Sequence, residues 1–158
     1  MCCLPLWTGI IHQKKKMKRA LNLTLMTCLF FSACKKDDNS SSTITTLAVT
    51  NTLSGGNWRI SYYWDTDHEE TSKFAQYTFT FGSSSVLTAV KGATIITGTW
   101  STILDDSKTK LVLNFSSPAS FSEISDDWHV IERTDTRIKL QDVSGGNGGT
   151  DYLTFEKN

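Results

Sequence analysis

Residues 57–65, NWRISYYWD, alternate large apolar side chains with other residues over the whole segment. Successive side chains of a β-strand point to opposite faces of the sheet, so residues two apart share a face. The face that we expect to be buried carries Trp58, Ile60, Tyr62 and Trp64. Tyr63 belongs to the opposite face, and we expect it to be exposed. The segment therefore predicts a half-buried strand that begins a β-sheet core.

Seven further runs of strand length follow, rich in β-branched and aromatic residues. They are QYTFTF at 76–81, SVLTAVK at 85–91, ATIITGTWST at 93–102, KLVLNFS at 110–116, DWHVIER at 127–133, RIKLQDV at 137–143 and DYLTFEK at 151–157. Gly, Asp, Asn and Ser between them favour tight turns, and only residues 118–125 predict a short helical turn. The pattern predicts an all-β fold, an eight-stranded antiparallel up-and-down barrel, with a β-sandwich as the alternative.

The first strand opens with Gly56-Asn57-Trp58, which resembles the G-x-W motif that opens lipocalins. Similar features recur along the chain: a second G-x-W at 98–100, a W-x-V strand at 128–130 and a final LTF at 153–155. This layout is similar to the small lipocalin-like domains of bacterial lipoproteins over residues 55–157. The resemblance implies a lipocalin-like barrel that Gly56 and Trp58 close at one end. The chain differs from typical lipocalins because it lacks their C-terminal helix.

The alternation of each strand also predicts which side chains fill the barrel. They are Trp58, Ile60, Tyr62, Trp64, Tyr77, Phe79, Phe81, Ile96, Trp100, Leu111, Leu113, Phe115, Trp128, Val130, Ile138, Leu140, Leu153 and Phe155. Each aromatic ring in this set buries on the order of 150–250 Å². A barrel of eight strands is barely wider than its own side chains. We therefore expect a filled interior, which argues against a large ligand cavity.

The N-terminal part of the chain has the order of a bacterial lipoprotein signal. Residues 14–42 read KKKMKRALNLTLMTCLFFSACKKDDNSSS, a basic run, a short apolar run and then a charged, serine-rich segment. The apolar run at 20–33 is shorter than the roughly 20 residues that a membrane-spanning helix needs. Small residues precede Cys34, as cleavage before a lipidated cysteine requires. We expect a signal peptide over residues 1–33, with Met17 as the true start, and lipidation of Cys34.

The same pattern divides the rest of the chain. Residues 34–55 are expected to form the lipidated cysteine and a flexible Ser/Thr-rich tether, and residues 56–158 the lipocalin-like barrel. Lys36-Asp37-Asp38 resembles the short charged signal that sends some Gram-negative lipoproteins to the cell surface. The sequence therefore predicts an outer-membrane protein held by the lipid on Cys34. It leaves open whether the domain faces the cell surface or the periplasm.

Charge and cysteine content exclude several kinds of partner and of reactive group. Residues 1–34 have a net charge of +5, whereas residues 35–158 carry 11 basic and 16 acidic groups. An acidic domain without a basic patch argues against nucleic acid. All four cysteines lie at or before Cys34, so the domain has neither disulfides nor a thiol nucleophile.

No motif predicts catalysis or a cofactor, and we expect no enzyme. The oxygen-rich run at 65–70 and the pairs Asp105-Asp106 and Asp126-Asp127 are interpreted as solvated turns rather than metal sites.

Two functions remain. The first is a binding module that takes a small apolar or amphipathic ligand at the open mouth of the barrel. We expect the loops at 65–73, 83–85 and 104–108, or those at the opposite end, to ring this mouth. The second is a structural or interaction module, a filled barrel whose outer face contacts another envelope protein or a glycan. An apolar cavity of at least roughly 300 Å³ would distinguish the first from the second, and the sequence does not identify the binding residues.

Overall fold

The computed structural model describes residues 43–144 and 148–158. The predicted signal peptide, Cys34 and most of the predicted tether lie outside the described residues. The described elements, in chain order, are α1 (Thr46–Leu53), β1 (Asn57–Asp65), β2 (His68–Glu69), the 3-10 helix η1 (Thr71–Phe74), β3 (Thr78–Phe81), β4 (Val86–Lys91), β5 (Thr94–Asp105), β6 (Lys108–Asn114), α2 (Ala119–Ser122), β7 (Asp127–Arg133), β8 (Arg137–Val143) and β9 (Thr150–Lys157). Among them is no helix long and apolar enough to cross a membrane.

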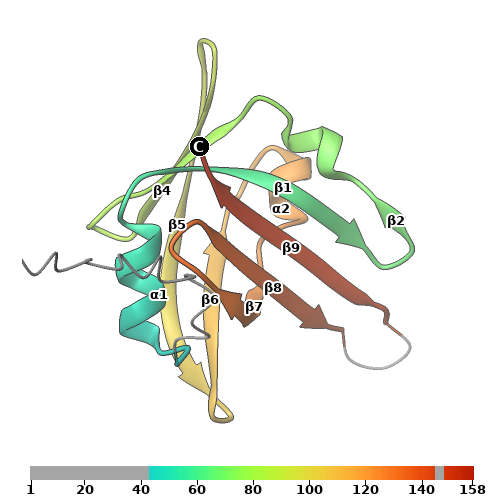
Figure 1. Cartoon of the computed structure of the whole chain (residues 1–158). Coiled ribbons are helices and arrows are strands. Elements are labelled where there is room, and N and C mark those ends of the chain that lie inside the picture. The colour runs from blue at the N-terminus through green and yellow to red at the C-terminus, as the bar shows by residue number, and fades with distance from the viewer. Residues whose placement is uncertain (1–42, 145–147) are drawn as a thin grey trace, which may run out of the picture. The chain divides into compact units, whose positions relative to one another are not determined.

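The strands form a closed antiparallel barrel. Their order is β2-β1-β3-β4-β5-β6-β7-β8-β9, and β1 pairs with β9 as well as with β3. The pairing of β1 with β9 closes eight strands into a barrel, and β2 is a short extra strand on the edge of β1 (Figure 1). The predicted eight-stranded up-and-down barrel is confirmed. The β-sandwich alternative is wrong, because this pairing leaves no separate second sheet among the described strands.

A β-bulge in β1 overturns one sequence prediction. Ile60 lies opposite Phe155 and Tyr62 lies opposite Thr154, so Ser61 is an extra residue in β1. One extra residue reverses the alternation of every side chain beyond it. Tyr63 is therefore buried, with 1% of its surface exposed, whereas Tyr62 is 37% exposed. The prediction that Tyr62 and Trp64 point inward and Tyr63 outward is wrong.

Aromatic rings fill the interior. Phe155 on β9 contacts Phe79 and Phe81 on β3 edge to face, with ring centroids 5.5 and 5.4 Å apart. Phe81 in turn contacts Trp100 on β5 at 5.2 Å. Apart from Tyr62, Trp64 and the partly buried Tyr77, the side chains predicted to point inward are all buried. Gly98 allows this packing, because a Cβ there would lie 2.4 Å from the carbonyl oxygen of Asn114.

Helix α1 covers one end of the barrel. The side chain of Thr45 caps the helix by accepting a hydrogen bond from the N–H of Ala48. Val49 and Leu53 are fully buried in the core, and α1 lies beside β5 (Figure 1). The predicted flexible tether therefore does not extend to residue 55. Polar residues between Val49 and Leu53 make the segment resemble a tether, but these two apolar residues, four apart, share one face of a helix.

Helices η1 and α2 cover the opposite end. Phe121 of α2 contacts Phe74 of η1 and Phe115, with centroids 5.3 and 5.0 Å apart. Trp128 donates a hydrogen bond of 3.0 Å from its indole N–H to the carbonyl oxygen of Ile124. The short helical turn predicted at 118–125 is confirmed as α2. With a helical cover at each end, the predicted open mouth is wrong.

The loops predicted to ring that mouth also lie far from one another. The chain that follows β1, at 65–73, reaches α2, where Lys73 bonds to Glu123. The hairpin at 104–108 lies at the α1 end, where the hydroxyl groups of Thr102 and Thr50 are 2.7 Å apart. They therefore cannot form one binding site.

Candidate functional site

Gly56 and Trp58 lie at the end of the barrel that α1 covers. Trp58 is fully buried, and its indole N–H donates a hydrogen bond of 2.9 Å to the carbonyl oxygen of Leu53. The Lys157 ammonium lies 5.5 Å from the centre of the Trp58 ring system. Gly56 has φ of +150°, and a Cβ there would lie 2.8 Å from Cε of Lys157. These contacts pack the start of β1 against the helix. The role of Gly56 and Trp58 in these contacts is structural.

A groove lies on the outside of the barrel, over strands β1, β9, β8 and β7. Its volume is about 670 Å³, in the range of small-molecule sites. The groove is lined by Arg59, Ser61, Tyr62, Ile131, Arg137, Lys139, Leu140, Tyr152, Thr154 and Glu156. We call it the outer-wall groove. Figure 1 shows β1, β9 and β8 side by side in the wall that carries it.

Two bulges border the outer-wall groove. Ser61 is the extra residue in β1, and Ile131 is the extra residue in β7. Both adjoin one row of the sheet, in which Thr154 pairs with Tyr62 on one side and Lys139 on the other. A bulge bends its strand and increases the local twist. The two outer strands of this four-stranded wall therefore carry bulges at nearly the same level, and both extra residues line the groove.

Two tyrosines and an isoleucine provide the apolar surface of the groove. Tyr62 and Tyr152 are each 37% exposed, and Ile131 is 39% exposed. Trp64, which is half-buried, pairs with Tyr152 across the strands. Tyr152 is therefore a diagonal neighbour of Tyr62, close enough for aromatic side chains to share one surface. The groove thus has broad rings that remain open to solvent.

Paired charges line the other side of the groove. Arg59 donates a hydrogen bond of 2.5 Å to Glu156. Glu132 accepts hydrogen bonds from both Arg137, at 2.5 Å, and Lys139, at 2.9 Å. The hydrogen bonds from Lys139 and then Arg137 hold the pKa of Glu132 below its usual value. The Glu132 carboxylate therefore stays ionised and holds Arg137 and Lys139 in position.

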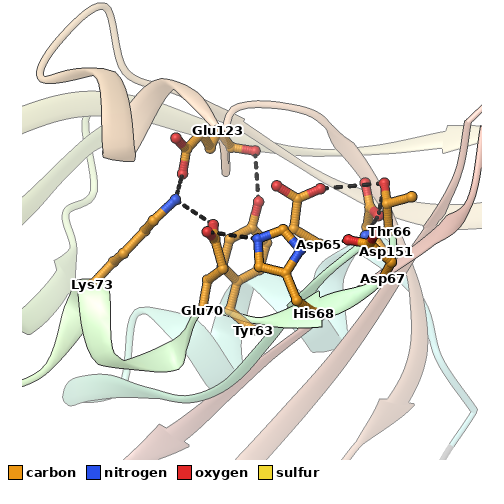
Figure 2. A network of polar contacts seen from close by, with 9 residues as sticks. All are labelled: Tyr63, Asp65, Thr66, Asp67, His68, Glu70, Lys73, Glu123 and Asp151. Atoms are coloured by element: carbon orange, nitrogen blue, oxygen red, sulfur yellow. Dashed lines mark hydrogen bonds and ion pairs between the residues drawn. The ribbon is translucent and has the colours of Figure 1, made fainter.

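A second polar cluster joins β2, η1 and α2 at the end that Phe121 covers. Lys73 bonds to Glu70 and, at 2.7 Å, to Glu123, the residue that follows α2 (Figure 2). His68 lies between Asp67, at 2.5 Å, and Glu70, at 2.9 Å. The hydrogen bonds to Asp67 and then Glu70 raise the pKa of His68. We call this cluster the end clasp, because its contacts fasten the two short helical segments over the barrel.

Tyr63 and Asp151 extend the end clasp to the barrel wall. The Tyr63 hydroxyl donates a hydrogen bond of 3.3 Å to the carbonyl oxygen of Glu123 (Figure 2). Burial, followed by nearby acidic groups, raises the pKa of Tyr63 well above its usual value, so it stays a neutral donor. Asp151 accepts a hydrogen bond of 2.7 Å from the backbone N–H of Thr66. The cluster is explained by its role in packing and offers no activated nucleophile.

A third cluster brings three carboxylates together near His129. Oxygens of Asp126, Asp127 and Asp142 lie within 4.8 Å of one another. Lys110 bonds to Asp127 at 2.7 Å and so neutralises part of this charge. Burial, followed by the Lys108 and Lys110 charges, lowers the pKa of His129. The cluster is an ion-pair network on the wall.

The sequence did not reveal the outer-wall groove. The structure separates the residues that sequence reasoning singled out: Trp58 is at the α1 end, the 65–70 run belongs to the end clasp, and Asp126-Asp127 lies near His129. The groove combines residues from four strands, and only the alternation of Arg, Lys and Glu with apolar residues in β8 and β9 marks them as outward-facing. The two bulges, which the sequence does not show, decide which aromatic side chains join them.

No family model and no curated protein matches the chain. The solved structures that are similar to it include the following two. One is a crystal structure of a DUF4847 family protein from Bacteroides vulgatus, with a TM-score of 0.49 and 16% identity over 70% of this chain and 97% of that one. The other is an NMR structure of a protein from Burkholderia xenovorans, with a TM-score of 0.39 and 19% identity over 76% of this chain and 96% of that one. Neither similarity assigns a function to this chain.

Proposed function

We propose that this protein is a lipid-anchored outer-membrane lipoprotein that acts as a binding module, and that it uses the outside of a filled lipocalin-like barrel. The partner, a glycan or another envelope protein, would bind in the outer-wall groove. The observation that carries the proposal is the contrast between the two sides of the wall. The inner side is packed with aromatic rings and covered at both ends, whereas the outer side has a groove of about 670 Å³.

The filled interior favours this function over the binding of a small apolar ligand inside the barrel. Phe79, Phe81 and Phe155 contact one another where such a ligand would lie. Admitting a ligand would require these rings to separate and the covering helices to move. Creating a cavity of that kind costs several kcal/mol. A ligand on the outer wall requires neither change.

The proposed anchor fits the extent of the described domain. Residues 35–42, eight in number, separate Cys34 from Thr43, where the described chain begins. A fully extended chain of this length reaches about 28 Å. A lipid on Cys34 would therefore keep the barrel close to the membrane surface. The proposal includes no catalytic step, because the described residues in the groove offer paired charges and aromatic rings rather than an activated nucleophile.

Co-purification of ligands tests where the protein binds its partner. We would isolate the full chain from the membranes of cells that make it and identify bound molecules by mass spectrometry. A variant with Tyr62→Ala and Tyr152→Ala should lose the bound molecule. The matched control, Val86→Ala with Val90→Ala, removes side chains of similar exposure, 41% and 37%, from β4, and should retain it. Equal retention by all three proteins would contradict binding at the outer wall.

The anchor has a separate test. Cys34→Ala should move the protein from the membrane fraction to the soluble fraction. Cys28→Ala, in the segment that signal cleavage would remove, is the matched control and should stay in the membrane. Membrane association of the Cys34→Ala protein would show that lipid on Cys34 is not the anchor.

A further inference from the structure

Positive charge is concentrated in the outer-wall groove, although the domain as a whole is acidic. Residues 43–158 contain nine Lys and Arg residues and 14 Asp and Glu residues. Three of the nine, Arg59, Arg137 and Lys139, line the groove. Within the described part of the chain they are paired with two carboxylates, those of Glu132 and Glu156. A local excess of positive charge on an acidic domain favours an anionic ligand at that place.

The two carboxylates hold the three cationic side chains in position, and some N–H donors of these side chains remain unused. Each arginine has five N–H donors and lysine has three, so the three side chains offer roughly thirteen donors, whereas two carboxylates have about eight acceptor sites. The side chains of Arg59, Arg137 and Lys139 are 50%, 41% and 41% exposed. Donors are therefore accessible to a ligand, and the ion pairs hold them in place before it binds. Such preorganisation reduces the entropy that binding costs.

The remaining lining residues match a sugar better than a simple anion. Tyr62 and Tyr152 present partly exposed rings, which can pack against the C–H face of a sugar ring. The hydroxyls of Ser61 and Thr154 belong to the same groove, although Thr154 is largely buried. They lie between the rings and the cations in the strand register. The groove thus combines flat apolar surface, hydroxyls and fixed positive charge.

We propose that the outer-wall groove binds an acidic oligosaccharide, whose carboxylate groups face Lys139 and the two arginines while its sugar rings lie on Tyr62 and Tyr152. This inference rests on the proposed function and names the ligand class of that same site. A nucleic acid fits less well, because its backbone requires a longer row of cations than these three. An apolar ligand would leave the charged side of the groove without a partner.

Isothermal titration with a matched pair of sugars tests this inference. The full chain, purified in detergent, would be titrated at low ionic strength with trigalacturonate and with its methyl ester. The two probes share the same rings, and only the acid carries charge. Trigalacturonate should bind at least tenfold more tightly than the ester, and added salt should reduce the difference because it screens exposed charges. Equal affinity for the two probes would overturn the selection of acidic sugars.

Three variants connect the selectivity to named residues. Lys139→Met keeps the length of the side chain and removes its charge, and should weaken trigalacturonate binding roughly fivefold to tenfold without changing binding of the ester. Lys108→Met removes an equivalent charge from the β5–β6 hairpin and should leave both affinities unchanged. Tyr152→Ala should weaken the binding of both probes. An effect of Lys108→Met as large as that of Lys139→Met would show a general charge effect and contradict a site at the groove.

The outcomes for the ligand class and for the proposed function can be separated. If neither sugar binds while the Tyr62→Ala, Tyr152→Ala protein still loses its co-purified molecule, the acidic oligosaccharide is wrong and binding at the outer wall stands. If that protein retains its co-purified molecule, the proposed function itself is wrong. A circular dichroism spectrum of each variant confirms that loss of binding does not reflect unfolding.

Discussion

The indole N–H of Trp58 donates a hydrogen bond of 2.9 Å to the carbonyl oxygen of Leu53, the last residue of α1. Both side chains are fully buried. The bond satisfies a carbonyl at the helix C-terminus, where no intrahelical partner is available. It also fixes the helix over the end of the barrel at the first strand. The helix cap and the barrel core are therefore a single packed unit.

Trp58→Ala should lower the free energy of unfolding by roughly 3–5 kcal/mol, because it leaves a cavity beneath α1 and an unsatisfied carbonyl at Leu53. Urea denaturation followed by circular dichroism measures the change. Trp64→Ala, at a half-buried outward position, is the control and should cost much less. Similar losses for the two variants would mean that Trp58 does not have the special packing that we describe.

The bulge at Ser61 predicts opposite results for two adjacent tyrosines. Tyr63→Ala should lower the free energy of unfolding by roughly 3–5 kcal/mol, because its ring packs against Phe74 with centroids 5.6 Å apart. Tyr62→Ala, on the outer wall, should change it by about 1 kcal/mol or less. Chemical denaturation of both variants gives the comparison. A larger loss of unfolding free energy for Tyr62→Ala than for Tyr63→Ala would mean that the alternation of β1 is unbroken, and would contradict the bulge.

Any residue other than glycine at position 98 would clash with its neighbours. A Cβ there would lie 2.4 Å from the Asn114 carbonyl oxygen and 2.5 Å from Cδ1 of Phe115. Gly98→Ala should therefore destabilise the barrel by roughly 1–3 kcal/mol. Thermal unfolding measures the loss, with Thr99→Ala at the neighbouring exposed position as the control. A melting temperature for Gly98→Ala equal to that of the unaltered protein would show that β5 and β6 are not this close.

The surroundings of the two histidines of the barrel predict pKa shifts in opposite directions. Hydrogen bonds to Asp67 and Glu70 raise the pKa of His68, whereas burial lowers the pKa of His129. Titration of the imidazole signals by NMR should place His68 above and His129 below the ordinary value of about 6.5. Glu70→Gln removes the negative charge of one hydrogen-bond partner and should move the pKa of His68 downward. The reverse order of the two histidines would contradict the clasp.

The same contacts give the clasp a pH dependence with a defined sign. Because the pKa of His68 is raised on folding, its contribution to stability is complete below about 6.5, the unfolded value, and is lost as pH rises through the folded pKa. The pKa of Glu70 is lowered, chiefly by Lys73, so its contribution is lost as pH falls through the folded value. Denaturation midpoints of the unaltered protein and His68→Gln should therefore differ at about pH 5.5, below the unfolded value, and converge as pH rises through the folded pKa of His68. A difference that grows with rising pH would contradict this sign.

Much of the fold could be predicted from local patterns in the sequence. The eight long strands follow from alternation and turn residues, and the boundaries agree within a few residues. Helix α1 and strand β2 were not predicted, because their own residues carry too little pattern to identify them. Helix α1 contains only Val49 and Leu53 as its buried apolar residues, a pattern too short to identify without the barrel end that they cover. The strand β2 has two exposed residues and forms only because β1 lies beside it.

The sequence by itself determined that the chain builds a β-barrel core, since alternating apolar residues must be buried on one face whatever their exact partners. Tertiary structure decided which side chains line the outer wall. The extra residue at Ser61 is visible only in the register of β1 against β9, and it sends Tyr63 inward and Tyr62 outward. The alternation of residues along one strand carries no information about a partner strand nearly a hundred residues away. The outer-wall groove therefore forms only when the barrel closes.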